Sequence, residues 1–345
     1  MSLLKQAPRY DLAEAVHLVR EMYGVEVSTS ALPSERDQNF LLTATISDHY
    51  VLKIANPSEG RAMLEAQNAA MAHVADRVAF CPRVRPTIAG DTIGIVQDNP
   101  HPAHLAHQPH PTHLVRPVTY LPGVPLATAG ARTPALLDNL GRAIGRLDAA
   151  LVDFDHPAIH RDFHWDLANA AHVIGEYLPL VRDDGDRELV ARVSASALPI
   201  VGARSAAFRR TVVHNDANDW NVLVDRDEVV GIIDFGDMVH SWTVVDPAVA
   251  VAYAVLDDAN PLATAAAIVR GYHAEHPLRD EELAAVFPLA SLRLCMSACI
   301  AAWQQKQRSD DEYLIVSQGP IRRTLPVLAA IAPRVAEQAL REACR

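Results

Sequence analysis

The chain contains 345 residues, of which 50% are hydrophobic, and its 31 basic and 42 acidic residues give a formal charge of -11 at pH 7. This acidic balance argues against a nucleic-acid partner, which favours a basic surface. Charges near the N-terminus interrupt the apolar core that a signal peptide needs, and no window reads as a membrane span of roughly 18 uncharged apolar residues. We therefore expect a cytoplasmic globular protein without a membrane partner.

The N-terminal third alternates between helical and β-type patterns. The expected elements are, in chain order, a helix over 9–23, short strands between about 27 and 54, a helix over 58–76, and strands over 91–97 and 112–121. Ser58 is the expected N-cap of the second helix, because it precedes a long run of good helix formers.

From residue 134 onward the pattern is mainly helical, interrupted by a strand–loop–strand region over 212–235. This change of character predicts an α+β fold with two lobes. We place a small β-rich N-terminal lobe at residues 1–116, a hinge at 117–123 and a larger, mainly helical C-terminal lobe at 124–345.

The segment "HPAHLAHQPHPTH", residues 101–113, repeats histidine at every third position. Its three prolines argue against a helix, so the repeat does not align the imidazoles on one helical face. We interpret the segment as an extended solvent loop, with a low-affinity surface metal site as the alternative.

The densest group of polar residues separates two apolar runs in "VVHNDANDWNVLV", residues 212–224. Asp216 precedes Asn221 by five positions, and Asp234 ends the apolar segment "VVGIID" and opens an Asp-Phe-Gly tripeptide. Phosphoryl transfer from a nucleotide needs a carboxylate that orients the acceptor hydroxyl and oxygen ligands that hold magnesium. Kinases use this arrangement, so the pattern predicts a site for a metal–triphosphate complex.

A site of this kind requires an upstream lysine on a strand and an acidic partner on the next helix. Lys53 lies in the apolar run "YVLKIA", and Glu65 lies twelve residues later on the predicted helix. We expect Lys53 to contact the nucleotide phosphates and Glu65 to hold Lys53 by a charge-assisted hydrogen bond. The alternative is a surface lysine on an edge strand.

These motifs resemble the aminoglycoside-phosphotransferase-like small-molecule kinases, a branch of the protein-kinase fold that includes choline kinases, and within it the hydroxylysine kinases. The resemblance extends from about residue 30 to 256 and includes "LPSERDQNFLL", "YVLKIANPSE", "VRPVTYLPG", "FDHPAIHRDFHWDL" and "GIIDFGDMVHSWTVVDPAVAVAYAVL". The chain departs from the kinase pattern before Lys53, where no Gly-rich phosphate loop is found. Ser34, Gln38 and Asn39 are the candidates to replace its donors.

The resemblance implies a role for each matching residue. Asp216 becomes the catalytic aspartate, and Asn221 and Asp234 become Mg²⁺ ligands. Backbone groups from Thr119 to Leu121 become the hinge that binds the purine of ATP or GTP; the hydroxylysine kinases imply GTP. His214 is expected to brace the catalytic loop. Asp246 is expected to accept hydrogen bonds from that loop, and it also reads as a helix N-cap before Pro247.

The acceptor is predicted to be a small molecule that carries an amine. Acidic and aromatic residues near the catalytic loop suit an ammonium group, and the candidates are Asp166, Asp219, Asp237 and Trp242. An amino acid with a side-chain hydroxyl fits, and 5-hydroxylysine fits the resemblance. Homoserine, choline or ethanolamine, aminoglycosides and sugars remain alternatives. The sequence leaves the oligomeric state open.

Two other classes of protein compete with a kinase. A catalytically inactive kinase-like binding protein would be favoured by the loss of Lys53, Asp216 or Asp234, yet all three are present. A metal-dependent hydrolase built on His214 would leave Lys53 and Glu65 without a role.

Overall fold

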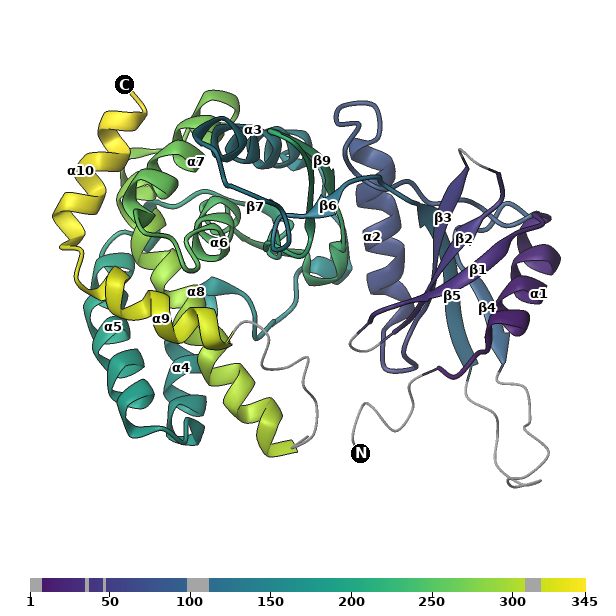
Figure 1. Cartoon of the computed structure of the whole chain (residues 1–345), viewed down its shortest axis with the longest axis horizontal. Helices are drawn as coiled ribbons and strands as arrows, with labels where there is room; N and C mark the ends of the chain where they lie inside the picture. The colour runs from purple at the N-terminus through teal and green to yellow at the C-terminus, as the bar shows by residue number, and fades with distance from the viewer. Residues whose placement is uncertain (1–7, 35–36, 46–47, 98–111, 308–317) are drawn as a thin grey trace. The chain divides into compact units, whose positions relative to one another are not determined.

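A computed structural model describes residues 8–34, 37–45, 48–97, 112–307 and 318–345 (Figure 1). The chain forms two compact units. Unit 1 comprises Met1–Ala75 and Cys81–Leu121, and unit 2 comprises Asp76–Phe80 and Pro122–Arg345.

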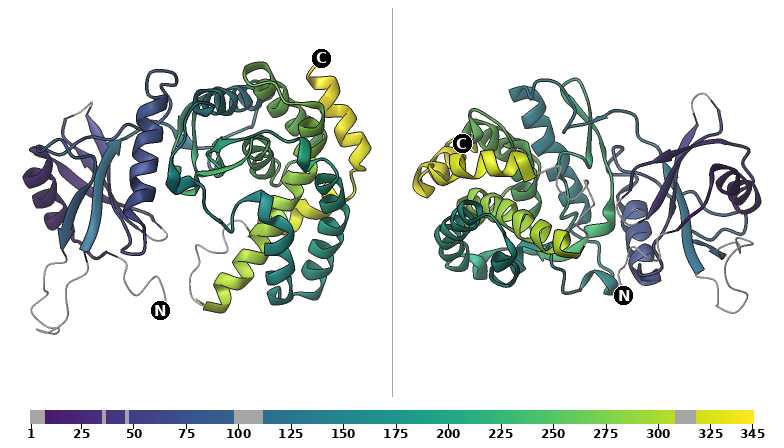
Figure 2. Two further views of the ribbon diagram at one scale, coloured as in Figure 1. Left: turned by 180° about the vertical axis from the view of Figure 1, so that it is seen from behind. Right: turned by 60° about the horizontal axis from the view of Figure 1, so that its bottom comes forward.

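Unit 1 is built on an antiparallel five-stranded sheet with the order β1-β2-β3-β5-β4. Its elements are α1 (Leu12–Tyr23), β1 (Ser28–Leu32), β2 (Gln38–Thr43), β3 (His49–Ile54), α2 (Arg61–Val74), β4 (Gly94–Gln97) and β5 (Thr112–Thr119). The two helices lie on opposite sides of the sheet in Figure 1 and in the reverse view of Figure 2.

The alternation of side chains along β2 and β3 decides which residues face each helix. Phe40, Leu42, Leu52 and Ile54 are almost completely buried in the core beneath α1. Because successive side chains of a strand point to opposite faces, Lys53 lies on the other face, which α2 covers.

The first two helices begin by different means. α1 begins at a capping box in which Asp11 and Glu14 satisfy each other's backbone N–H groups. The expectation that Ser58 caps α2 is wrong, because the N-cap is Gly60 and no side chain bonds to that helix end. Ser58 instead donates its N–H and hydroxyl to Oδ1 of Asn56, at 3.0 and 2.8 Å, in the turn before the helix.

Unit 2 combines helices with short antiparallel strands. Its helices are α3 (Pro134–Leu151), α4 (Ala170–Tyr177), α5 (Asp184–Gly202), α6 (Val245–Ala254), α7 (Pro261–Glu275), α8 (Asp280–Gln307), α9 (Gln318–Ala329) and α10 (Pro333–Ala343). Its strands are β6 (Val124–Pro125), β7 (Arg210–Val213), β8 (Val222–Asp225), β9 (Glu228–Ile232) and β10 (Val239–Trp242). β6, β8 and β9 form one small sheet, and β7 and β10 form another.

Helix α8 departs from the expectation that no stretch of the chain is long and apolar enough to cross a membrane. The stretch Asp280–Lys306 is long and apolar enough to cross a membrane, yet 94% of its most apolar window is buried inside the protein. In Figure 2 this helix runs beside α4, α5 and α9, as expected for the central helix of a bundle.

The repeated histidines of residues 101–113 fall mostly outside the described residues. Of that set, His113 lies on β5, where it is buried and its Nδ1 is 3.1 Å from the carbonyl oxygen of Ala55. A surface metal site in this segment stays a hypothesis.

Candidate active site

Two loops of unit 2 lie side by side because of the strand register. One loop joins β7 to β8 over residues 214–221, and the other joins β9 to β10 over 233–238. Val213 pairs with Val239, and Val222 pairs with Ile232, so each loop begins and ends next to the other. The loop that carries Asp216 and Asn221 is therefore held along the loop that carries Asp234.

The Asp216 carboxylate is held by three side-chain donors. Its Oδ1 accepts hydrogen bonds from Asn218 Nδ2 at 2.9 Å and from Arg293 Nη2 at 3.0 Å. Its Oδ2 accepts one from Asn221 Nδ2 at 2.7 Å. About a fifth of the Asp216 side chain, 20%, remains exposed, so the carboxylate is fixed in orientation and still reachable.

Burial and charge act on this carboxylate in opposite directions. Burial raises the pKa of Asp216 well above its ordinary value, and the nearby carboxylate of Asp237 acts in the same direction. The guanidinium of Arg293 opposes both by favouring the ionised form. Arg293 thus supplies the positive charge that compensates a carboxylate in this position.

Asn221 and Asp234 present oxygen atoms of the kind that bind magnesium. Asp216 offers Asn221 only acceptors, so Asn221 turns its NH₂ group toward the backbone oxygen and Oδ2 of Asp216, at 3.0 and 2.7 Å. This orientation points the amide oxygen away from Asp216. Asp234 is exposed and has a left-handed backbone with φ of 64°, an unusual conformation for an aspartate that places it at the turn after β9.

His214 connects the two loops. Its Nε2 lies 3.1 Å from the carbonyl oxygen of Ile233, and its Nδ1 accepts the backbone N–H of Asp216 at 3.3 Å. These two partners select the neutral tautomer that carries its proton on Nε2. Burial lowers the pKa of His214, which also favours the neutral ring.

Asp246 holds the start of the same loop. Its two carboxylate oxygens accept the backbone N–H groups of His214 and Asn215, at 2.7 and 2.6 Å. Asn215 has a left-handed backbone with φ of 65°, so these bonds stabilise a strained turn directly before Asp216. Asp246 does not cap α6, because that helix begins at Val245 after the N-cap Val244.

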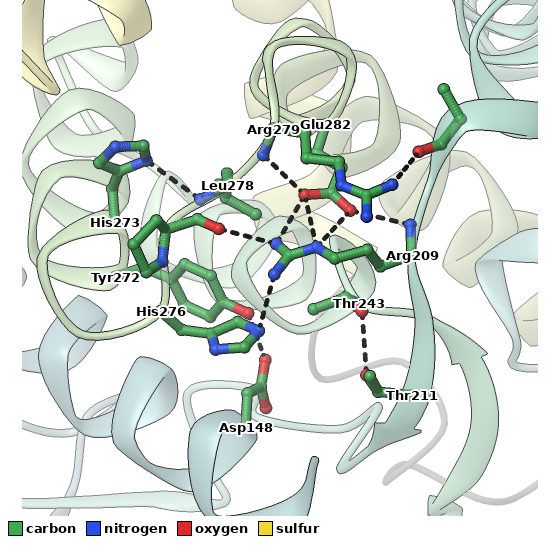
Figure 3. A network of polar contacts seen from close by, with 12 residues as sticks. Asp148, Arg209, Thr211, Thr243, Tyr272, His273, His276, Leu278, Arg279 and Glu282 are labelled. Carbon is green, nitrogen blue, oxygen red and sulfur yellow. Dashed lines mark hydrogen bonds and ion pairs between the residues drawn. The ribbon is translucent and has the colours of Figure 1, made fainter.

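A second polar network joins α3, α7 and α8 to the segment before β7 (Figure 3). The buried carboxyl of Asp148 on α3 accepts the Tyr272 hydroxyl of α7 at 2.6 Å. Burial raises the pKa of Asp148, and the nearby Asp246 carboxylate adds to the rise. Arg209, next to β7, binds the fully buried Glu282 of α8, with Nη2 and Oε2 2.7 Å apart.

In unit 1, Lys53 and Glu65 are on elements that face each other. Lys53 is directly opposite Arg116 on β5, so the two cations share a face of the sheet. Arg116 is buried and donates to Gln67, Asn68 and the Leu64 carbonyl, all on α2. Glu65 is on the same helix, where its Oε1 binds Nε of Arg61 at 2.9 Å. Its predicted contact with Lys53 stays a prediction.

The residues expected to replace a phosphate loop occupy different environments. Ser34 is exposed, and Asn39 is half-buried opposite Lys53 in the sheet. The Gln38 amide binds both backbone groups of Tyr10, at 2.8 and 2.7 Å, and so ties the segment before α1 to β2. This contact gives Gln38 a structural task besides its predicted one.

At the predicted hinge, the backbone N–H of Thr119 donates to the carbonyl oxygen of Arg83 at 2.8 Å. Within the described part of the chain, the N–H and carbonyl of Leu121 have no hydrogen-bond partner. Leu121 is therefore the better placed of the two to bind a purine by its backbone.

The four residues predicted to bind the acceptor are unequally placed. Asp166 is buried, accepts the backbone N–H of Ala168 at 3.0 Å and the Ser241 hydroxyl at 2.5 Å, and so caps a short helix. Asp219 is also buried, and burial raises its pKa to about 6, with Arg132 opposing the rise. Asp237 is half-buried on the Asp234 loop, whereas the half-buried Trp242 packs edge-on against Phe208.

Arg293 and Asn218 are the contacts of Asp216 that sequence reasoning missed. Asn218 is two residues from Asp216, and its signal is the polar density of the loop. The signal for Arg293 is a lone cation in the apolar run "SLRLCMSACIAAW". Such a charge is buried only with a partner, but the partner lies 77 positions away in the sequence.

Comparison with known proteins shows which family the chain is similar to. The sequence profile described as "Phosphotransferase enzyme family" matches residues 28–283. Hydroxylysine kinase of Mus musculus is 31% identical over 336 residues, which cover 90% of this chain and 87% of that protein. Homoserine kinase of Methylobacillus glycogenes is 28% identical over 236 residues, which cover 66% of this chain and 65% of that protein.

Solved structures share the fold. Amicoumacin kinase hAmiN, in complex with AMP-PNP, Ca²⁺ and Ami, superimposes with a TM-score of 0.67 at 14% identity and covers 94% of this chain and 97% of its own. A microcompartment-associated aminopropanol kinase gives a TM-score of 0.65 at 18% identity, with 97% and 99% covered. These likenesses confirm the predicted fold class, a kinase-like fold with a β-rich N-terminal and a mainly helical C-terminal part.

Proposed function

The chain belongs to the phosphotransferase enzyme family and is a small-molecule kinase, and from this premise we propose that its acceptor is a small amine-bearing alcohol, with 5-hydroxylysine first among the candidates. The phosphate comes from the γ position of a purine nucleoside triphosphate, ATP or GTP. The reaction is expected to take place in the cytoplasm.

The observation that carries the proposal is the arrangement of Asp216. Three donors fix its carboxylate, and the register of the strands holds its loop along the loop of Asp234. A fixed carboxylate can orient the acceptor hydroxyl and accept its proton as the oxygen attacks the γ-phosphorus. Asp216 is thus the proposed catalytic residue, and His214 and Asp246 keep its loop in place.

The metal ligands follow from the oxygen atoms available. The amide oxygen of Asn221 and the carboxylate of Asp234 are hard donors of the type that Mg²⁺ prefers, so the residues fit this ion. When bound there, Mg²⁺ would neutralise charge on the phosphate oxygens. The chain itself contributes the turn at Asp234 and the bond between Asn221 and Asp216, which together set where these oxygens point.

Unit 1 is proposed to anchor the donor. Lys53 would bind the α- and β-phosphates and Glu65 would hold it, while Ser34, Gln38 and Asn39 supply donors for the outer phosphates. Backbone groups at Thr119 and Leu121 would bind the purine. The likeness to hydroxylysine kinases supports GTP as the donor, and the choice between GTP and ATP is left to experiment.

The proposed acceptor site lies on the unit 2 loops. Asp237 and Asp219 are the leading carboxylates for an ammonium group, with Asp166 and Trp242 as further candidates. Relatives named for hydroxylysine, homoserine and aminopropanol support an acceptor that carries both an amine and a hydroxyl. Choline, ethanolamine, aminoglycosides and sugars are the alternatives to test.

A screen of acceptors against both nucleotides tests the proposal. Nucleotide consumption would be measured with 5-hydroxylysine, homoserine, aminopropanol, choline, an aminoglycoside and a sugar, each with ATP and with GTP. Acceptor-dependent consumption greatest with 5-hydroxylysine supports the proposal. Consumption greatest with a sugar would reassign the acceptor, and the absence of acceptor-dependent consumption throughout would reject the kinase role.

A further inference from the structure

The fully buried cation of α8 is the starting observation. Arg293 is 1% exposed and lies in α8, a helix long and apolar enough to cross a membrane. A charged group in such a place is retained only where specific partners compensate its lost hydration. The identity of those partners therefore indicates what the residue is for.

The partners of Arg293 converge on the catalytic loop. Nη2 donates to Oδ1 of Asp216 at 3.0 Å, and Nη1 donates to the carbonyl oxygen of Trp165 at 2.9 Å. The guanidinium also lies over the rings of Trp165 and Tyr253, with its carbon 4.6 and 5.8 Å from their centroids. The rings and the carbonyl restrict the guanidinium on its other sides, so Nη2 is held toward Asp216.

This contact determines the orientation of one carboxylate oxygen. Without Arg293, Oδ1 would retain only the neutral donor Asn218, while Oδ2 would stay bound to Asn221. A carboxylate that can rotate presents its lone pairs to the acceptor in many directions. Phosphoryl transfer depends on positioning, and a misplacement of about 1 Å can cost on the order of 100-fold in rate.

We propose that Arg293 is a positioning residue for phosphoryl transfer, which locks the plane of the Asp216 carboxylate by a charged hydrogen bond to Oδ1. The inference rests on the proposed role of Asp216. Arg293 acts through Asp216, and in the part of the chain that the structure describes its hydrogen bonds go to Trp165 and Asp216 and not to the predicted metal ligands. Its loss should therefore affect turnover and leave nucleotide affinity nearly unchanged.

The test compares Arg293→Met, which removes the charge, with Arg293→Lys, which keeps it but lacks the planar fork. Arg293→Met should lower kcat by on the order of 100-fold, with the nucleotide KM within about threefold of wild type. Arg293→Lys should recover about tenfold of that loss, because an ammonium group can still bond to one oxygen. If the Met variant does not fold, the Lys variant carries the test by the same division between kcat and KM.

Arg209→Met is the matched control. Arg209 also forms an ion pair with α8, through the buried Glu282, but it does not contact Asp216. The Arg209→Met variant should lower the melting temperature about as much as Arg293→Met does. It should leave kcat of the folded protein within about threefold of wild type. A merely structural Arg293 would behave like this control.

Three results would overturn the inference. The first is wild-type kcat in Arg293→Met, or in Arg293→Lys if only that variant folds. The second is an equal loss of kcat in Arg209→Met, and the third is an effect on the nucleotide KM with kcat unchanged. A wild-type protein without turnover on any acceptor would reject the proposed function itself, so the two failures are distinguishable.

Discussion

At the scale of single residues, the polar side chains of the candidate site are held in fixed orientations by their hydrogen-bond partners. Asp216 is bound by Asn218, Asn221 and Arg293, and His214 uses both ring nitrogens within the two loops. Hydrogen bonds of this kind restrict the side chains that form them. The roles we assign to these residues can be separated by substitutions that keep their size.

Asp216→Asn should retain the fold and nucleotide affinity and lose most turnover. The amide is nearly isosteric but cannot accept the proton of the acceptor hydroxyl, and general-base groups contribute roughly 100- to 10,000-fold. Steady-state kinetics with the best acceptor and nucleotide titration would measure both quantities. Turnover at the wild-type rate would contradict the assignment of Asp216 as the catalytic residue.

Asp234→Ala should abolish the magnesium dependence of nucleotide binding. Asn221 is neutral, so the remaining ligand cannot offset the charge of the metal and the triphosphate. Calorimetric titrations with and without Mg²⁺ would measure the difference, with Asp225→Ala, an exposed aspartate at the end of β8, as control. Unchanged magnesium-dependent binding in Asp234→Ala would remove it from the list of metal ligands.

At the scale of elements, helices α3 and α7 pack with their backbones in close contact. A Cβ atom at Gly141 of α3 would lie 1.9 Å from the Ile268 carbonyl oxygen, and one at Gly271 of α7 would lie 2.0 Å from that of Asp138. Glycine is required at both positions because neither backbone neighbour can move aside alone. The same helix pair carries Asp148 and Tyr272.

Gly141→Ala should destabilise the protein by about 1–3 kcal/mol or more, because the added methyl group forces the two helices apart. Gly175→Ala on α4 is the control, since a Cβ there meets nothing within 4 Å and the change should stabilise the helix by roughly 0.5–1 kcal/mol. Urea denaturation would measure both free energies of unfolding. Equal effects of the two substitutions would show that the contact between α3 and α7 yields easily.

At the scale of the whole molecule, the formal charge of -11 is unfavourable for a triphosphate ligand. Local cations must therefore compensate, and the proposed one in unit 1 is Lys53, which pairs across the sheet with Arg116. The acidic surplus suits a cationic acceptor instead, because a positively charged small molecule is drawn toward an acidic protein. The net charge of the protein is thus expected to oppose binding of the nucleotide donor and to favour binding of the acceptor, and added salt should weaken both effects.

The deaminated analogue of the best acceptor should be nearly inert. If carboxylates such as Asp237 and Asp219 bind the ammonium group, its removal leaves a charge unpaired, a loss on the order of 2–5 kcal/mol. Values of kcat/KM for the acceptor, its deaminated analogue and a neutral polyol would measure the effect. Equal efficiency with the polyol would move the chain to the sugar kinases and leave the roles of Asp216 and Asp234 intact.

The sequence by itself determined the two loops of the candidate site and the fold class. Asp216, Asn221 and Asp234 lie within nineteen consecutive positions, on loops whose ends are short apolar strands. Antiparallel pairing of such strands places the loops together with few alternatives, so local spacing was sufficient to predict them. The family match confirms the kinase class that this spacing predicted.

Only the tertiary structure decided which distant side chains complete the site. Arg293 reaches Asp216 from a helix 77 positions away in the sequence. Gln38 is bonded to the backbone of Tyr10, 28 positions away, and Asp166 accepts the hydroxyl of Ser241, 75 positions away. Contacts of this kind depend on how helices pack against the loops, and no periodicity along the chain encodes that packing.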